Sequence, residues 1–180
     1  AWQSWFEHMP VPRFANDPTR TYRSLRVGRT VELFAPDTRQ YRDAQACDDA
    51  AFAVCAEADA PGRTMLGAAQ KQWLLDGMTQ SDARWKVVAN ANMMMGMVVA
   101  DNGSRAFMDT WDGYGAERAE ILSTAAQNVE NLVLVTGDDH DGYAGELWDT
   151  GFAPGTPSGA QANAPGTQRA GVEFVVPSVT

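Results

Sequence analysis

The residues best suited to chemistry lie in one short stretch, residues 132–141. Residues 132–135 (Leu-Val-Leu-Val) are all apolar, which predicts a short strand buried on both faces. Gly137 suits a sharp turn after that strand, because glycine adopts backbone angles that other residues avoid. Asp138 and His140 follow two positions apart, so in an extended loop their side chains would point the same way. A carboxylate and an imidazole that converge at a strand end predict a metal site with these two residues as its catalytic ligands.

The same stretch has a second interpretation, an acidic surface turn. Residues 137–142 are Gly-Asp-Asp-His-Asp-Gly, and Asp and Gly are favoured turn residues. His140 is one of only two histidines in the chain, which favours a functional role. The residues alone leave both interpretations open.

Another candidate ligand ends a second predicted strand, over residues 84–92. The strand is apolar at its centre and finishes in Asn90-Ala91-Asn92. The side-chain oxygens of the two amides, Asn90 and Asn92, could bind a hard metal ion such as Ca²⁺. The alternative is that these amides only hydrogen-bond the loop that follows, which is the commoner role of Asn.

Charged residues also gather in the predicted loop over residues 35–43. Arg39 or Arg42 could contact an anion there. We favour the alternative, that the two arginines pair with Asp37 and Asp43 and fix the loop, because Arg forms strong hydrogen-bonded pairs with nearby carboxylates.

Hydrophobic periodicity predicts an alternation of strands and helices around these loops. Strands are predicted over residues 20–27, 30–34, 84–92, 132–135 and 171–177, the first two as a hairpin. Helices are predicted over residues 2–9, 65–78, 116–126 and 143–148. Residues 152–168, rich in Gly, Pro, Ala and Ser, predict a long irregular loop. Met93, Met94, Met95 and Met97 are expected to fill gaps in the core.

Length and charge narrow the classes of function. The 180 residues make one domain or a part of one. The net charge of −9 and the isoelectric point of about 4.6 argue against a nucleic-acid partner, which requires a basic surface. No apolar run reaches the roughly 18 residues of a transmembrane helix, and no signal peptide is visible. The sequence opens on Ala1, in the middle of a helical pattern, so we expect that the true start lies upstream.

The two cysteines, Cys47 and Cys55, lie eight positions apart. In an oxidising compartment they would form a local disulfide, and the alternative is two free thiols. A zinc site is disfavoured because no His nearby completes a tetrahedral ligand set.

Seven segments in order carry a resemblance that spans nearly the whole chain. They are Tyr22-Arg23-Ser24-Leu25, Asp37-Thr38-Arg39-Gln40-Tyr41-Arg42, Met65-Leu66-Gly67 with Gln70 and Trp73, Trp85-Lys86-Val87-Val88-Ala89-Asn90, Trp111-Asp112-Gly113-Tyr114 with Glu117-Arg118, Thr136-Gly137-Asp138-Asp139-His140, and Glu173-Phe174-Val175. Each motif alone is weak, but in this order they resemble the alkaline phosphatase D (PhoD-like) family of secreted metallophosphoesterases.

The resemblance implies an α/β (α+β) fold of the calcineurin-like metallophosphatase type, a two-sheet sandwich flanked by helices. Residues 1–180 would be the middle and later part of the catalytic domain, incomplete at both ends. Trp5, Glu7 and Pro10 match the family segment that follows the earlier metal ligands, so those ligands would lie upstream. Localisation is expected to be secreted, periplasmic or at the cell envelope, and the protein is expected to be a monomer.

The resemblance also implies the chemistry. Asp138 and His140 match the metal-site residues of the family's Gly-Asp-x-His motif, whereas the middle position, Asp139, varies and gains no role. The cofactors would be Ca²⁺ and Fe³⁺, and the substrate a small phosphate ester or phosphodiester. A Gln often follows the residue that matches Asn90, but here that position is Ala91. The alternative function is a non-catalytic calcium-binding domain or a decayed phosphatase.

Overall fold

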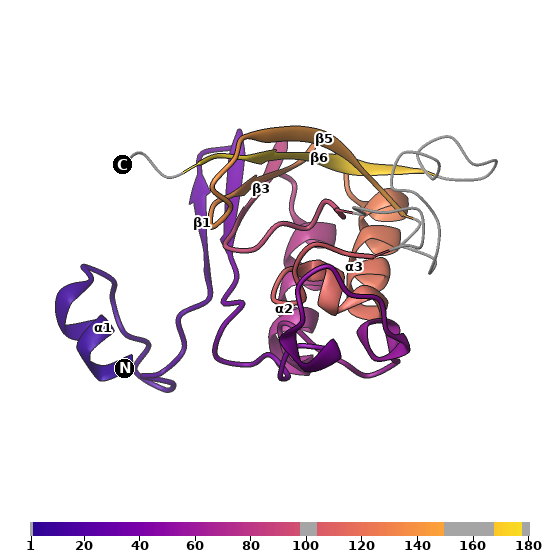
Figure 1. Ribbon diagram of the computed structural model, residues 1–180. Helices are drawn as coiled ribbons and strands as arrows, with labels where there is room; N and C mark the ends of the chain where they lie inside the picture. Colours follow the sequence, from indigo (N-terminus) through magenta and orange to yellow (C-terminus); the bar gives the residue numbers. More distant parts are fainter. Residues whose placement is uncertain (1, 98–103, 150–167, 178–180) are drawn as a thin grey trace.

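The computed structural model describes residues 2–97, 104–149 and 168–177, whose strands form one mixed six-stranded sheet (Figure 1). The strand order is β1-β2-β3-β4-β6-β5. The inner strands pair in parallel: β2 (Val31–Ala35), β3 (Trp85–Asn90), β4 (Leu132–Thr136) and β6 (Arg169–Val175). The edge strands β1 (Arg23–Val27) and β5 (Tyr143–Trp148) pair antiparallel with their neighbours. The predicted α/β class is confirmed, and the described strands form one sheet, whereas the resemblance implies two.

Two helices, α2 (Ala68–Gln80) and α3 (Gly115–Asn128), lie beneath the sheet in Figure 1, and α1 (Trp2–His8) lies apart from them. Three short 3₁₀ helices lie in the connections: η1 (Cys47–Asp49), η2 (Ala56–Asp59) and η3 (Trp111–Gly113). None of the helices in the described part of the chain has the length and apolar character needed to span a bilayer.

The core lies between the sheet and these two helices. Phe34, Val88 and Leu134 are register neighbours on β2, β3 and β4, and all three are buried. They belong to one cluster with Leu74 of α2 and Leu122 of α3. Because side chains alternate across a strand, one face of the sheet is buried under the helices and the other points away from them.

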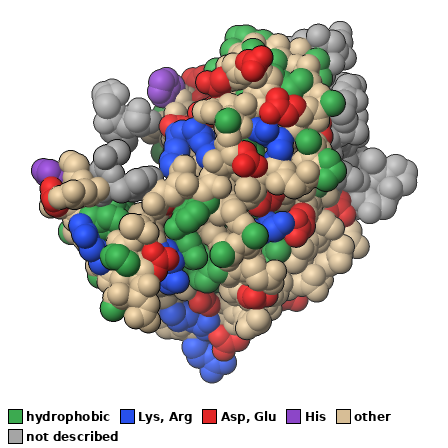
Figure 2. Space-filling view, turned by 90° about the horizontal axis from the view of Figure 1, so that it is seen from below, with side chains coloured by type: hydrophobic (Ala, Val, Ile, Leu, Met, Phe, Trp, Pro, Cys, Tyr) green, Lys and Arg blue, Asp and Glu red, His purple; other side chains and the backbone are tan. Residues whose placement is uncertain are grey.

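The other face of the sheet is apolar and exposed. Val135 on β4 is 43% exposed and Leu25 on β1 is 61% exposed. Phe174, the register partner of Val135 on β6, is exposed as well. The prediction that residues 132–135 are buried on both faces is therefore wrong, because in the described structure the helices cover only one side (Figure 1). On the helix side, by contrast, acidic and basic side chains are spread over the surface (Figure 2).

The predicted helix over residues 143–148 is also wrong. This segment is β5, which pairs with β6 along its length and buries Leu147 in the core. The partner strand is more than twenty residues further along the chain, so the segment's own sequence does not reveal the pairing.

The other predicted elements are confirmed with shifted ends. The hairpin is β1 and β2, the later strands are β3, β4 and β6, and the helices are α1, α2 and α3. α2 begins at Ala68, later than predicted, because the residue before it, Gly67, has a φ of 70°, outside the helical region. Residues 152–167 of the predicted loop lie outside the described residues.

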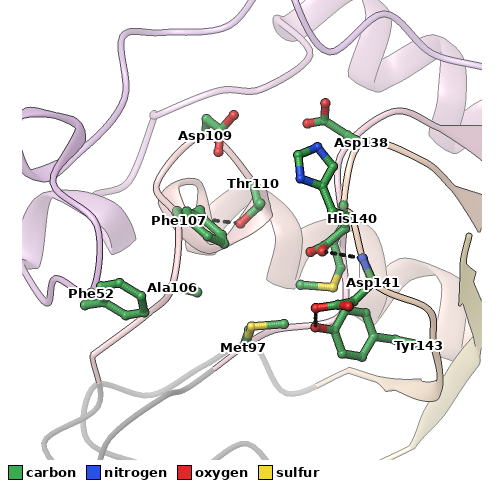
Figure 3. A pocket seen from close by; sticks show the side chains of 12 residues that line it. Phe52, Met97, Ala106, Phe107, Asp109, Thr110, Asp138, His140, Asp141 and Tyr143 are labelled. Atoms are coloured by element: carbon green, nitrogen blue, oxygen red, sulfur yellow. Dashed lines mark hydrogen bonds between the residues drawn. The ribbon is translucent and has the colours of Figure 1, made fainter. Parts of the chain in front are cut away.

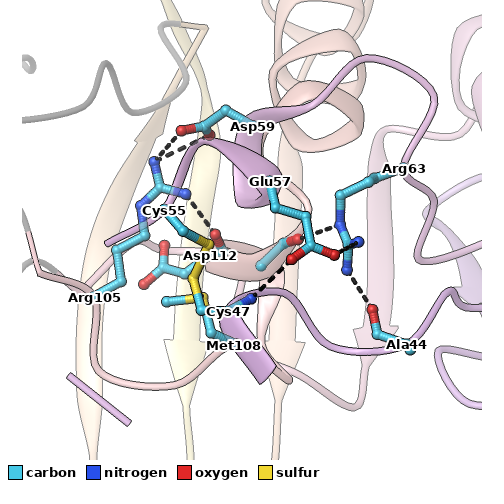
Figure 4. The surroundings of a disulfide bond; sticks show 10 residues. Ala44, Cys47, Cys55, Glu57, Asp59, Arg63, Arg105, Met108 and Asp112 are labelled. Carbon is cyan, nitrogen blue, oxygen red and sulfur yellow. Dashed lines mark hydrogen bonds and ion pairs between the residues drawn. A yellow bond between two sulfur atoms is a disulfide. The ribbon is translucent and has the colours of Figure 1, made fainter. Parts of the chain in front are cut away.

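The predicted disulfide is confirmed between Cys47 and Cys55 (Figure 4). It closes a loop between η1 and η2, and both cysteines pack against a small cluster that contains Met108. The loop is therefore tied covalently at its base.

A buried carboxylate, that of Glu173 on β6, holds the loop after β3 in place. It accepts hydrogen bonds from the N–H groups of Met94, at 2.9 Å, and Met95. It also accepts one from the hydroxyl of Thr136 at the end of β4, at 2.6 Å. Burial raises the pKa of the Glu173 carboxyl, although these hydrogen bonds and Arg118 act in the opposite direction.

Reducing the disulfide should destabilise the fold. For a loop of this length, the Cys47→Ser/Cys55→Ser variant should lose about 2–3 kcal/mol in the free energy of unfolding, because the unfolded chain regains the entropy of the open loop. Urea unfolding with and without a reducing agent measures the change. Reduction should weaken the parent to the same extent and leave the double variant unaffected. Equal stability of all forms would contradict the prediction.

The raised pKa of Glu173 should make stability depend on pH. Below the ordinary Glu value of 4.5, both folded and unfolded chains are protonated at this residue. Between that value and the higher folded value, only the folded chain keeps the proton, so the free energy of unfolding falls as the pH rises through this window. Glu173→Gln removes the titratable carboxyl group and should therefore reduce the fall in the free energy of unfolding with pH. Urea unfolding between pH 4 and 8 measures this dependence. Glu146→Gln, at an exposed position on β5, is the matched control and should keep the parent's slope.

Candidate metal-binding active site

The loops that follow β2, β3 and β4 meet at the carboxyl ends of these parallel strands, where α/β proteins usually place their sites. Arg39 follows β2, Asn92 follows β3 and Asp138 follows β4. One carboxylate oxygen joins the three loops: Oδ2 of Asp138 accepts hydrogen bonds from Nη2 of Arg39 and Nδ2 of Asn92, each at 3.2 Å.

The position of Arg39 differs from the prediction. Instead of pairing with Asp37 and Asp43, its guanidinium lies 3.2 Å from Asp138 and 3.9 Å from Asp109. Asp37 is engaged elsewhere, because its Oδ1 accepts the backbone N–H groups of Arg39 and Gln40, both at 2.9 Å. This turn at Asp37 leaves the Arg39 side chain free to reach across to the β4 loop.

Asp138 and His140 reach the same hollow by a tight turn and not by an extended loop. Asp138 has a φ of 70°, in the left-handed region that few residues other than glycine adopt. The N–H of Asp139 then donates to the carbonyl of Gly137 at 2.9 Å. A non-glycine residue held in this conformation is the kind of local strain that clusters at functional sites.

The hollow that these residues line is open and has a volume of about 590 Å³ (Figure 3). Asp138, Asp139, His140 and Asp141 form one side, and Figure 3 places Asp138 and His140 close together there. The structure thus brings the two predicted ligands to one cavity, and Arg39 forms an ion pair with one of them, Asp138.

The two amides near the end of β3, Asn90 and Asn92, make different contacts. Asn90 is buried, its Nδ2 donates to the backbone carbonyl of Asn92, and its Oδ1 has no hydrogen-bond partner in the described structure. Asn92 is fully buried, accepts a hydrogen bond from Thr38 at 2.5 Å and donates to Asp138. The sequence pattern offered both amides as ligands, and in the structure Asn92 is the one that contacts Asp138.

The donor atoms of Asp138, His140 and Asn90 are of types that bind metal ions. A buried amide oxygen without a hydrogen bond costs free energy, and binding a cation would offset that cost. However, within residues 2–97, 104–149 and 168–177 no three His, Cys, Asp or Glu side chains gather as a metal-binding group. The donor types suit a metal, and further ligands would have to complete the shell.

Comparisons with known proteins identify the family and support the fold. The family model for PhoD-like phosphatases matches residues 1–180. Alkaline phosphatase D of Bacillus subtilis (strain 168) is 36% identical over 152 residues, which cover 82% of this chain. A solved structure titled "Structure of PhoD" superposes with a TM-score of 0.84 and 31% identity, covering 99% of this chain.

The match covers only part of each relative. This chain spans 26% of the Bacillus protein and 33% of the chain in the solved structure. Because the family model covers the whole chain and the solved PhoD structure shares its fold, the chain belongs to the PhoD-like phosphatase family.

Proposed function

We propose that this chain is part of an enzyme that hydrolyses phosphate esters, including phosphodiesters, at a metal centre. The observation that carries the proposal is the Asp138 carboxylate, on which three strand-end loops converge in a hollow that His140 also lines. Membership of the PhoD-like phosphatase family supports it. The chain would be the middle and later part of the catalytic domain.

Asp138, His140 and Asn90 are the proposed ligands of Ca²⁺ and Fe³⁺. Carboxylate and amide oxygens suit hard Ca²⁺, and a carboxylate with an imidazole suits iron. Such ions lower the pKa of a bound water and neutralise charge on the phosphoryl oxygens. The remaining ligands would come from polypeptide outside this chain.

Arg39 is the proposed contact for the phosphate group. Its guanidinium is partly exposed and is held between Asp109 and Asp138, which both line the hollow. A guanidinium presents two parallel N–H donors that match two phosphate oxygens. Bound there, the ester would be oriented with its phosphorus towards the strand ends.

The exposed apolar face of the sheet supports the calcineurin-like sandwich. Exposed apolar patches of this kind usually mark a surface that another element covers. We propose that a second sheet from the rest of the polypeptide packs there, and that the chain alone has little or no activity. The disulfide favours a secreted, periplasmic or cell-envelope location, and a monomer is the proposed state.

The alternative is a non-catalytic calcium-binding domain or a decayed phosphatase. The observation that favours it is the exposed acidic turn that carries Asp138 and Asp141, together with the lack of a three-residue ligand group in the described part of the chain. Such a domain would bind Ca²⁺ and turn over no ester.

Removing either proposed ligand should abolish the activity of the full-length protein. Asp138→Ala and His140→Ala should each lower kcat/KM for bis(4-nitrophenyl) phosphate at least about 100-fold, and bound metal should fall in parallel. Absorbance assays and elemental analysis measure the two effects. Asp139→Ala, in the same turn but without a proposed role, is the matched control. Activity that survives in both ligand variants would refute the site, and an inactive parent that binds Ca²⁺ would favour the alternative.

Removing the Arg39 guanidinium should weaken substrate binding. Arg39→Ala should raise KM about tenfold, because a hydrogen bond to a charged group is worth roughly 1.5–3 kcal/mol. Arg39→Lys should recover part of the loss through its charge but not the two-pronged geometry. Steady-state kinetics with the same ester measure both variants. A KM that stays at the parent's value in Arg39→Ala would show that Arg39 only holds Asp138.

A further inference from the structure

The hollow at the strand ends has a second wall, which carries Asp109 and Thr110 and is apolar over the rest of its surface. Phe52, Phe107 and Met97 line the side away from Asp138 and His140 (Figure 3). Phe52 is 63% exposed and Phe107 is 45% exposed, although aromatic rings usually bury most of their surface. Their ring centroids lie 6.3 Å apart, within the range of a favourable aromatic pair.

Backbone pairing sets the two rings side by side. The N–H of Phe52 donates to the carbonyl of Ala106 at 3.1 Å. Ala53 and Arg105 then exchange hydrogen bonds of 3.2 and 2.8 Å in an isolated antiparallel bridge. Phe52 is held at a φ of 56°, in the left-handed region. The backbone pairing therefore fixes the position of the Phe52 ring, at some local conformational cost.

A disulfide and buried hydrogen bonds hold in place the two segments that carry the rings. The disulfide between Cys47 and Cys55 closes the loop that holds Phe52 (Figure 4). Arg105, which is buried, donates to both carboxylate oxygens of Asp59 at 3.0 and 2.8 Å and to the carbonyl of Asp112 at 2.6 Å. An apolar wall on anchored loops is preorganised, so little entropy is lost when a ligand binds to it.

The two walls differ in the ligand chemistry that they suit. The wall with Asp138, His140 and the nearby Arg39 suits a metal-bound phosphate group. The wall with Phe52 and Phe107 suits a hydrocarbon or aromatic group. Binding of such a group is favoured because it removes apolar surface from water. A volume of about 590 Å³ has room for both parts of one small ligand.

We propose that Phe52, Phe107 and Met97 form a subsite for an apolar alcohol group of the phosphate ester. The preferred substrates are then phosphodiesters in which one alcohol carries an alkyl or aryl group. This inference rests on the proposed function, since it assigns the part of the same substrate that does not react.

The test uses the full-length protein and a series of phosphodiesters with one constant leaving group. Each ester releases 4-nitrophenolate, while the second alcohol is methyl, hexyl or phenyl. The parent should show a kcat/KM about tenfold or more higher for the hexyl and phenyl esters than for the methyl ester, mainly through KM. Phe52→Ala and Phe107→Ala should each reduce that ratio about threefold or more, and Phe107→Leu should restore most of it.

The controls separate this inference from the function on which it rests. Val54→Ala lies in the same disulfide loop at a position that is 47% exposed and outside the lining of the hollow, so it should keep the parent's ratio. A parent that hydrolyses all three esters equally well, or a ratio unchanged in both alanine variants, overturns the subsite and leaves the proposed function standing. No turnover of any ester by the metal-loaded parent overturns the proposed function, and the subsite with it.

Discussion

The site depends on buried charged side chains that hold the loop after β3. Glu173 binds the N–H groups of Met94 and Met95, Arg118 donates to the carbonyl of Met94, and Asp112 accepts the N–H of Met97 at 3.0 Å. Burial raises the pKa of Asp112 and lowers that of Arg118, with each charge opposing the shift of the other. Buried charges are costly and are retained when they are paired and hydrogen-bonded.

That loop is where the two walls of the hollow meet. Asn92 at its start contacts the Asp138 carboxylate, and Met97 at its end lines the same hollow as the two phenylalanines. Glu173 also bonds Thr136 at the end of β4, two residues before Asp138. A shift of the loop would therefore move the polar and the apolar wall together. Charged groups are used in this core because apolar packing alone would leave the loop's N–H groups without hydrogen-bond acceptors.

The sequence predicted most of the fold because its periodicities are strong. The apolar stripe of α2 and the apolar runs of β3 and β4 are local patterns, and they placed the strand ends that carry Asn90 and Asp138. The family motifs placed His140 beside Asp138, and the cysteine spacing pointed to the disulfide. The error at β5 arose because an edge strand is defined by its partner, here β6, and its own residues do not distinguish strand from helix.

By itself, the sequence determined the chemical types present and the family, because these depend on which residues occur and in what order. The tertiary structure decided which of those residues meet. Arg39 pairs with Asp138, 99 positions away, and not with its neighbours, because Asp37 is occupied by the turn that it caps. Phe52 and Phe107 likewise come together only through a backbone bridge between distant loops. Contacts of this kind follow from strand order and loop closure, which no local pattern encodes.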